Sequence, residues 1–168
     1  MPTRKWIAGS ALAGLLVTMA SSARGQEDAA LAKALQTKHV ALSAGLTGAA
    51  PSGKPISAMF EWEDAKLKLS VFVVKTGVYS EVFLDPASGK VLSNEKLTDD
   101  DDIKVTRKYG AAIQNAKITL DAALAKALAA NAGYTAVKII PAIKNGDAVA
   151  QVTLIKGTTF KTVTVPLA

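Results

Sequence analysis

The chain lacks cysteine altogether, and His39 is its only histidine. Without cysteine it can form no disulfide, no thiolate metal site and no lipid-modified N-terminal cysteine, and it has no cysteine nucleophile. A single histidine excludes metal sites that need several imidazoles, and His39 is the only residue that could act as the base of a Ser-His-Asp triad. These gaps disfavour most classes of enzyme. We therefore expect a binding or regulatory protein without catalytic residues, cofactor or bound metal.

Aromatic residues are also scarce, at 5% of the 168 residues. Hydrophobic residues nevertheless make up 49% of the chain and charged residues 20%, a balance that is typical of globular proteins and argues against disorder. A chain of this length is enough for one domain or two small ones.

The first 25 residues have the three parts of a signal peptide. Residues 1–5 are basic, the next 15 residues are apolar, and Ala23-Arg24-Gly25 places small residues where a signal peptidase reads them, before Gln26. Ser21-Ser22-Ala23 is an alternative cleavage site. A retained membrane anchor is a second interpretation, but the apolar run falls short of the roughly 20 residues that a membrane span requires. We expect a periplasmic or secreted protein with no stable membrane span after cleavage.

Export changes the meaning of the formal net charge of +6. The first 25 residues hold three basic residues and no acidic one, so the mature chain keeps 17 basic and 14 acidic residues and a net charge of +3. This modest excess gives little reason to expect a nucleic-acid partner. Lys104, Arg107 and Lys108 lie next to an acidic run, and we expect them to form a solvated helix face.

The octapeptide DAALAKAL occurs twice, at residues 28–35 and 121–128, and strand-like segments follow each copy. This order indicates an internal duplication. In the first copy we expect one helix from Glu27 or Asp28 through Leu42, and then a break at residues 45–55. In the second copy we expect a helix over residues 120–130, with Thr119 as its N-cap.

Alternating apolar residues predict the strands of both copies. In the first copy, a DPASG turn at residues 85–89 leads into a short final segment, and the predicted strands are residues 56–63, 67–73, 78–84 and 90–92. In the second copy, the hairpin dipeptide Asn145-Gly146 separates the first two of three predicted strands, residues 137–143, 148–156 and 158–165. Every connection is short, so neighbouring strands should be antiparallel.

Between the copies, apolar residues from Val105 to Ala116 recur at helical intervals. They predict a bridging helix with Gly110 as its weak point. The acidic run Asp99–Asp102 precedes it. Calcium binding is one interpretation of this run, but the alternating spacing and the glycine of an EF-hand loop are missing. We expect a solvated helix N-terminus instead.

Two further groups of polar residues are candidate sites. Glu61 and Glu63 are paired carboxylates on the polar face of a predicted strand, where no cleft is evident. His39 lies beside Lys38 in the first predicted helix, and we expect it to be a surface or half-buried residue. Neither group predicts catalysis.

The segment from Val82 to Leu92 (VFLDPASGKVL), with the alanine-rich helix and the strands before it, resembles the PepSY domain family. That family has an aromatic or aliphatic run there, followed by Asp, a small turn, Thr or Ser, Gly, a charged residue and Val-Leu. Residues 118–123 (ITLDAA) similarly resemble the opening of a second PepSY unit, although the closing motif does not follow it. The resemblance covers residues 28–93 and part of residues 119–165.

The resemblance implies a non-catalytic domain of extracytoplasmic bacterial proteins. Members in the propeptides of thermolysin-type secreted proteases are associated with restraint or folding of the protease, and small free-standing members with the regulation of proteases near the cell surface. The family pattern contains no catalytic or cofactor residues. It therefore implies none for this chain.

Together these observations predict an α+β protein with two PepSY-like units, each an α-helix packed on a small antiparallel meander. The expected segments are a signal peptide at residues 1–25, a first unit at 26–95, an acidic linker and bridging helix at 96–117, and a second unit at 118–168. The expected function is that of an exported, non-catalytic binding module that regulates an extracytoplasmic protease or another envelope protein. The alternative is an envelope protein that binds a small ligand or cation, in a pocket between the copies or at the acidic run.

Four large side chains are candidates for a protein-interaction surface. If the aliphatic residues of the first copy face its helix, then Met59, Phe72, Tyr79 and Phe83 lie on the opposite face of the strands. Such a patch is unusual on a free surface and marks a contact. Either an external partner covers it, or the bridging helix or second copy packs there and makes it part of the core.

The export hypothesis predicts the N-terminus of the protein made by its host. Mass spectrometry should find a chain that starts at Gln26, or at Arg24 if the alternative site is cleaved. A majority of molecules that retain Met1 or Pro2 would contradict the hypothesis.

Overall fold

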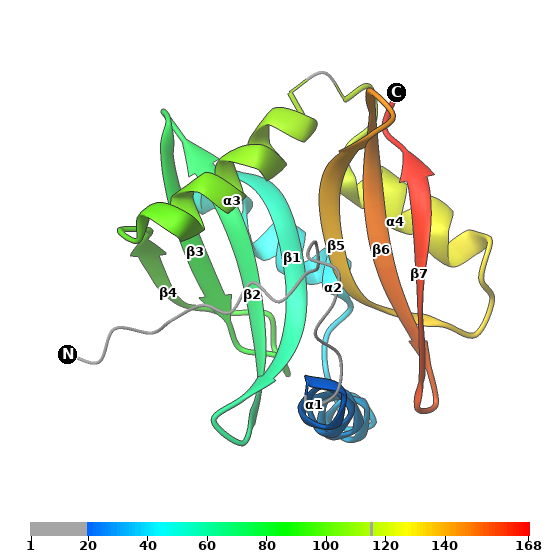
Figure 1. Cartoon of the computed structure of the whole chain (residues 1–168). Helices are drawn as coiled ribbons and strands as arrows, with labels where there is room; N and C mark the ends of the chain where they lie inside the picture. Colours follow the sequence, from blue (N-terminus) through cyan, green and yellow to red (C-terminus); the bar gives the residue numbers. More distant parts are fainter. Residues whose placement is uncertain (1–19, 115) are drawn as a thin grey trace.

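The computed structural model describes residues 20–114 and 116–168 and has the expected α+β architecture (Figure 1). Its strands form a seven-stranded antiparallel sheet in the order β4-β3-β2-β1-β5-β6-β7. The strands are β1 (Lys54–Glu63), β2 (Lys66–Lys75), β3 (Val78–Leu84), β4 (Val91–Lys96), β5 (Thr135–Lys144), β6 (Asp147–Lys156) and β7 (Thr159–Pro166). The helices are α1 (Ala20–Ala34), α2 (Leu42–Ala49), the short 3-10 helix η1 (Ala50–Ser52), α3 (Asp100–Ala112) and α4 (Leu120–Ala129).

The sheet consists of two strand groups that meet at one short junction. Strands β1–β4 form the first strand group and β5–β7 the second, and β1 pairs with β5 only at Ala58–Ile139 and Met59–Lys138. Helix α2 packs on β1, β2 and β3, and α4 packs on β5, β6 and β7. In Figure 1 both of these helices lie behind the sheet, whereas α3 crosses in front of the first strand group.

One hydrophobic core runs through both strand groups. Alternation along the strands supplies it, because residues opposite each other in the register share a face. In the first strand group the face toward α2 holds buried residues from three strands, Ala58, Phe60, Leu69, Val71, Val73, Val82 and Leu84. The second strand group continues the core with Ile139, Val152 and Leu154, under Leu124 of α4. The strand pattern expected from the sequence is therefore present.

The turns also form as the sequence indicates. In the DPASG turn, one carboxylate oxygen of Asp85 accepts hydrogen bonds from the N–H groups of Ala87 (3.2 Å) and Ser88 (2.7 Å) and from the Ser88 hydroxyl (2.7 Å). These bonds lower the pKa of Asp85, the Ser88 hydroxyl most strongly. Between β5 and β6, Asn145 and Gly146 both have positive φ (53° and 90°), which is the hairpin geometry that this dipeptide favours.

The first copy does not contain the single helix predicted from residue 27 or 28 through Leu42. Helix α1 ends at Ala34, a loop follows, and α2 starts at Leu42. The Thr37 hydroxyl donates to the Ala34 carbonyl (2.6 Å), and the Val40 N–H donates to the Pro86 carbonyl (2.8 Å). A β-branched residue whose side chain takes a helix carbonyl is a poor helix former, so the chain leaves the helix here.

Helix α2 includes two glycines that were expected to lie in a break. A Cβ atom at Gly45 would lie 3.2 Å from a methyl carbon of Leu69, and one at Gly48 would lie 2.8 Å from a methyl carbon of Leu84. These two glycines therefore do not form a turn. They lack a Cβ atom, and this lets α2 lie close to the sheet. Because tertiary packing rewards this approach, it outweighs the low helix propensity of glycine.

The two DAALAKAL octapeptides occupy different places in the fold. Residues 121–128 lie in α4, which covers the second strand group, whereas residues 28–34 lie in α1, which contacts β1 and β2 at the lower end of the sheet (Figure 1). The helix that corresponds to α4 by its position on the sheet is α2. Identical octapeptides therefore pack in different places, because the surfaces around each helix differ.

The predicted signal peptide lies mostly outside the described residues, which begin at Ala20. Helix α1 starts there and continues through the predicted cleavage sites to Ala34. Cleavage before Gln26 would leave the octapeptide in the mature chain.

A pair of glycine substitutions tests the close approach of α2. Gly110→Ala in α3 should raise the free energy of unfolding by up to about 1 kcal/mol, because alanine is the better helix former and its Cβ would lie at ordinary contact distances from the Tyr79 hydroxyl (3.4 Å) and ring (3.5 Å). Gly48→Ala should lower it instead, because its Cβ would also lie 3.0 Å from the backbone oxygen of Gly89. Urea unfolding of both variants measures the difference, and an equal gain from both would contradict the packing argument.

Candidate functional site

The four residues of the predicted interaction surface share one face of the first strand group. The register pairs Phe83 with Ser70 and Ser70 with Met59, and it pairs Tyr79 with Val74, on the face opposite α2. Met59 is 3% exposed and Phe72 4%, whereas Tyr79 and Phe83 are half-buried. All four therefore lie on the face opposite α2, but only Tyr79 and Phe83 retain appreciable exposed surface.

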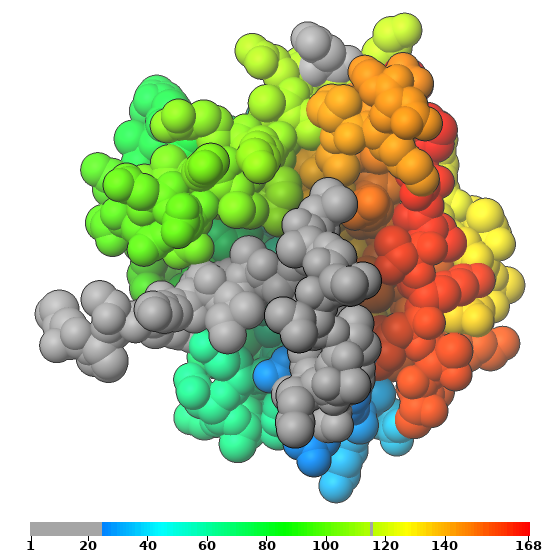
Figure 2. Space-filling view, in the orientation of Figure 1, coloured from blue at the N-terminus to red at the C-terminus, as the bar shows by residue number. Residues whose placement is uncertain are grey.

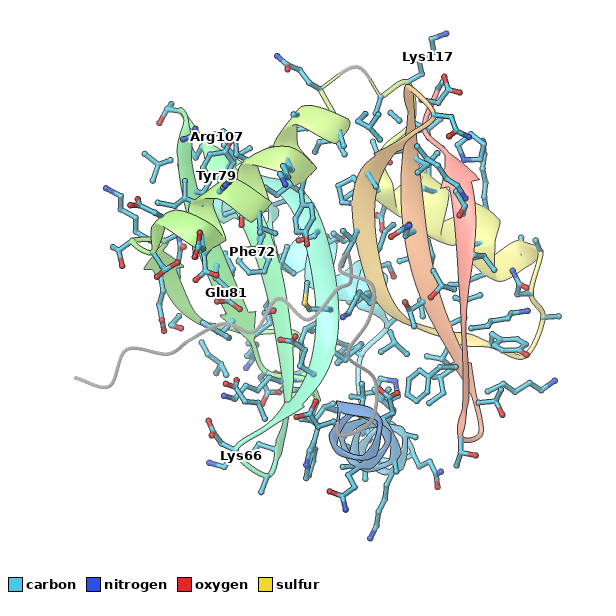
Figure 3. The ribbon with its side chains drawn as sticks, viewed as in Figure 1. Lys66, Phe72, Tyr79, Glu81, Arg107 and Lys117 are labelled. Carbon is cyan, nitrogen blue, oxygen red and sulfur yellow. The ribbon has the colours of Figure 1, made fainter. Side chains whose placement is uncertain are left out.

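Helix α3 accounts for the position of Tyr79. The Tyr79 hydroxyl lies 3.4 Å from where a Cβ of Gly110 would be, so the ring packs directly on the α3 backbone. Figure 3 shows Tyr79 under α3, with Phe72 and Glu81 lower on the same face. In Figure 2 the atoms of α3 adjoin those of the β5–β6 hairpin, and α3 indeed contacts β1, β3 and β5. Around Tyr79 the bridging helix thus makes an intramolecular contact, and an external contact at Phe83 stays a prediction.

The same face contains polar side chains that the sequence did not single out. Ser57, Ser70 and Glu81 are each buried, and the hydroxyls of Ser57 and Ser70 have no hydrogen-bond partner among the described residues. Ser57 lies opposite Phe72, and Phe72 opposite Glu81, across three neighbouring strands. Alternation places these residues on the polar face but does not indicate their burial. Burial here follows from what packs over the sheet.

The acidic run forms the N-terminus of α3, as expected. One carboxylate oxygen of Asp99 accepts hydrogen bonds from the N–H groups of Asp101 (2.9 Å) and Asp102 (3.2 Å). Partial burial raises the pKa of Asp102, and the nearby carboxylates of Asp99 and Asp101 raise it further. Among the described residues, no group of three or more acidic, histidine or cysteine side chains has a geometry suited to a metal ion.

The remaining candidates take part in local contacts. His39 lies in the loop between α1 and α2, with Nδ1 2.9 Å from the Thr37 carbonyl oxygen and its ring edge-on to Phe60 at 5.3 Å. Glu63 and Asp64 both bind the ammonium group of Lys68, at 2.6 and 3.0 Å. These contacts stabilise the loop and the β1–β2 hairpin, and they assemble no acid–base pair around a cleft.

Strand β4 presents an exposed apolar edge that the sequence reasoning missed. It forms one edge of the sheet, and Val91 and Leu92 at its start are 47% and 67% exposed. The register with β3 is irregular at Leu84, which is opposite Val91. The sequence does contain a sign of this edge. Val91 and Leu92 are adjacent apolar residues between a tight turn and a polar segment, and they lack the alternation that is typical of a packed strand.

A pocket of about 450 Å³ lies where α2, which packs on the first strand group, comes close to the start of α4, which packs on the second. Its walls come from α2 and η1, from the start of β1, and from the segment that joins α3 to α4. Lys54 and Lys117 line it beside mostly apolar residues. The sequence suggested a pocket between the copies but named none of its residues, because they come from segments far apart in the chain.

Comparison with known proteins provides little beyond this geometry. No family model matches the sequence, and no curated protein matches it. The structure aligns with the crystal structure of a "putative lipoprotein" from Clostridium difficile 630, with a TM-score of 0.41, 15% sequence identity, and coverage of 67% of this chain and 74% of that chain. At these values the likeness identifies neither a family nor a function. The PepSY resemblance therefore stays a prediction from the quoted residues.

In the described part of the chain, no helix combines the length and the apolar character that a membrane span needs.

The raised pKa of Asp102 gives a pH-dependent prediction. Because the folded pKa lies above the unfolded one, the ionised carboxylate lowers stability at neutral pH, and this cost disappears as the pH falls through the folded pKa. Asp102→Asn should therefore raise the Tm at pH 7 by roughly 1–3 °C and have no effect at about pH 3. The control Asp100→Asn removes a favourable charge from the first turn of α3 and should not raise the Tm. Equal stabilisation by Asp102→Asn at both pH values would contradict the explanation.

Proposed function

We propose that this chain is an exported, non-catalytic binding module that takes up an extended segment of a partner protein along β4. The observation that carries the proposal is the edge position of β4 among the described strands, together with the exposed side chains of Val91 and Leu92 on it. An edge strand offers N–H and C=O groups in the spacing that another strand requires. Proteins that recognise peptides by strand addition use such an edge for affinity and the neighbouring side chains for specificity.

The exposed apolar pair Val91 and Leu92 indicates that β4 contacts a partner rather than water. Sheet edges that are protected against association carry charges, prolines or bulges. At the opposite edge, β7 contains three threonines and ends at Pro166, and Val163 and Val165 point toward α4 rather than outward. β4 carries the charged residues Glu95 and Lys96 at its far end and an irregular register with β3 beside Leu92, but Leu92 is the most exposed large hydrophobic side chain among the described residues. Burial of Leu92 by a partner would remove this apolar surface from water.

The PepSY resemblance supports a finer form of the proposal. The residues that carry it end in Val91 and Leu92, so the motif and the exposed edge coincide. The Asp85 hydrogen bonds hold the turn that delivers the chain into β4. In this form the partner is an extracytoplasmic protease, the bound segment belongs to that protease, and binding restrains its activity. The signal-peptide pattern supports the matching location in the periplasm or outside the cell.

A charge placed on the edge tests the proposal. Leu92→Lys should reduce capture of the partner from the host's envelope fraction at least tenfold, because it puts an ammonium group where an apolar contact is expected. Ile143→Lys is the matched control, since Ile143 is 57% exposed at the β5–β6 hairpin and lies away from β4. It should leave capture unchanged. Loss of capture in both variants, or in neither, would contradict binding at β4.

Two further measurements separate the general proposal, strand addition of a partner segment at β4, from its finer form, in which the partner is a protease. Hydrogen exchange of the complex should show new protection of the β4 amides, whereas protection confined to another surface would overturn strand addition. If the captured protein is a protease, adding the purified module should slow its cleavage of a peptide substrate, and Leu92→Lys should slow it less. A captured protein without protease activity would overturn only the fine form.

A further inference from the structure

A pocket lies between α2 and the segment before α4, and none of its lining residues belongs to β4. Its volume of about 450 Å³ falls within the usual range for small-molecule sites. It joins residues from α2 and η1, which belong to the first unit, to the segment before α4, which opens the second. Sites between structural units commonly hold small ligands, because two surfaces together enclose more of a ligand than one does.

Most of the pocket wall is apolar. The floor is made by Leu46, Ile113 and Leu120, which are buried. Half-buried Pro55, Ala116 and Ile118 extend the apolar surface toward the opening, and exposed Ala50 lies at the opening itself. A wall of this kind favours a ligand with an apolar body.

Hydrogen bonds to the Leu167 carbonyl fix the pocket wall that Lys117 and Ile118 form. The N–H groups of Lys117 and Ile118 both donate to the Leu167 carbonyl, at 2.7 and 3.3 Å, and Leu167 is fully buried. Thr119 caps α4 by accepting a hydrogen bond from the Ala122 N–H at 3.1 Å. These bonds fix the backbone of this wall before a ligand arrives, so ligand binding does not have to order it.

The charged groups at the opening determine the kind of head group. Lys54 and Lys117 are exposed, and neither forms a salt bridge with another described residue. Figure 3 shows Lys117 at the top of the molecule, beside the segment that joins α3 to α4. Asp121 is the one acidic residue among those that line the pocket. Two cationic groups against one anionic group give the opening a net positive charge.

We infer that this pocket binds a small amphipathic anion, with its apolar body against Leu46, Ile113 and Leu120 and its anionic head beside Lys54 and Lys117. The apolar body supplies most of the affinity. The exposed lysines contribute less, because water and salt screen them, but they decide the sign of the charge that is accepted. The ligand class is therefore a carboxylate or comparable monoanion on a short hydrocarbon chain.

Three probes with the same hydrocarbon chain test the ligand class in the full purified protein. Decanoate, decanol and decyltrimethylammonium are titrated below their micelle-forming concentrations, and NMR follows the methyl signals of Leu46, Ile113 and Ile118. Decanoate should shift these signals saturably and bind at least fivefold more tightly than decanol, with decyltrimethylammonium weakest. Equal affinity of decanoate and decanol would overturn the anionic assignment, and shifts confined to methyl groups elsewhere would overturn the site.

Four variants test the residues. Lys54→Gln combined with Lys117→Gln should weaken decanoate at least fivefold and leave decanol unchanged, whereas the control Lys144→Gln, at the β5–β6 hairpin, should change neither. Asp121→Asn should strengthen decanoate. Ala50→Trp should fill the opening and abolish binding of all three probes, with thermal unfolding as the check that the fold persists. Undiminished decanoate binding in the double lysine variant or in folded Ala50→Trp would overturn the proposal. Because none of these residues lies on β4, the outcome is independent of strand addition at that edge.

Discussion

The pairing of β1 on both of its sides is the constraint on which the rest of the structure depends. β1 pairs with β2 along most of its length and with β5 at two positions, and Ile56, Ser57, Ala58, Met59 and Phe60 are all buried. A strand in this position needs cover on both faces, which α2 and α3 help to supply from opposite sides. The short β1–β5 ladder then joins the two strand groups into one sheet with one core.

This arrangement leaves two kinds of place for binding. The central strands offer no binding surface, because their backbone groups pair with neighbouring strands and their side chains pack in the core. Among the described strands, β4 and β7 have a neighbour on one side only, and β4 carries the exposed Val91 and Leu92. Where the units meet away from the ladder, their surfaces do not close fully, and the pocket beside Lys54 and Lys117 results. Both proposed sites thus follow from how the two strand groups share one sheet.

Local sequence patterns predicted the strands, the turns and the caps well. Asp85, Asn145-Gly146, Asp99 and Thr119 act within a few residues of themselves, so their hydrogen bonds and backbone angles can be anticipated from short segments. The helices of the first copy were predicted less well. Thr37 competes for a helix carbonyl, and Gly48 lies in α2 because the sheet lies close behind it. The second of these causes is a contact with a distant segment.

By itself, the sequence determined the α+β class, the antiparallel hairpins and which residues alternate along each strand, because these depend on local periodicity and turn chemistry. Only the tertiary structure decided that Met59 and Phe72 are buried, that α2 rather than α1 corresponds to α4, and that the β4 edge is open. Each of these depends on which surfaces meet across long stretches of chain. An apolar side chain has the same pattern in the sequence whether it is covered by its own chain, by a partner or by water, and packing alone distinguishes these cases.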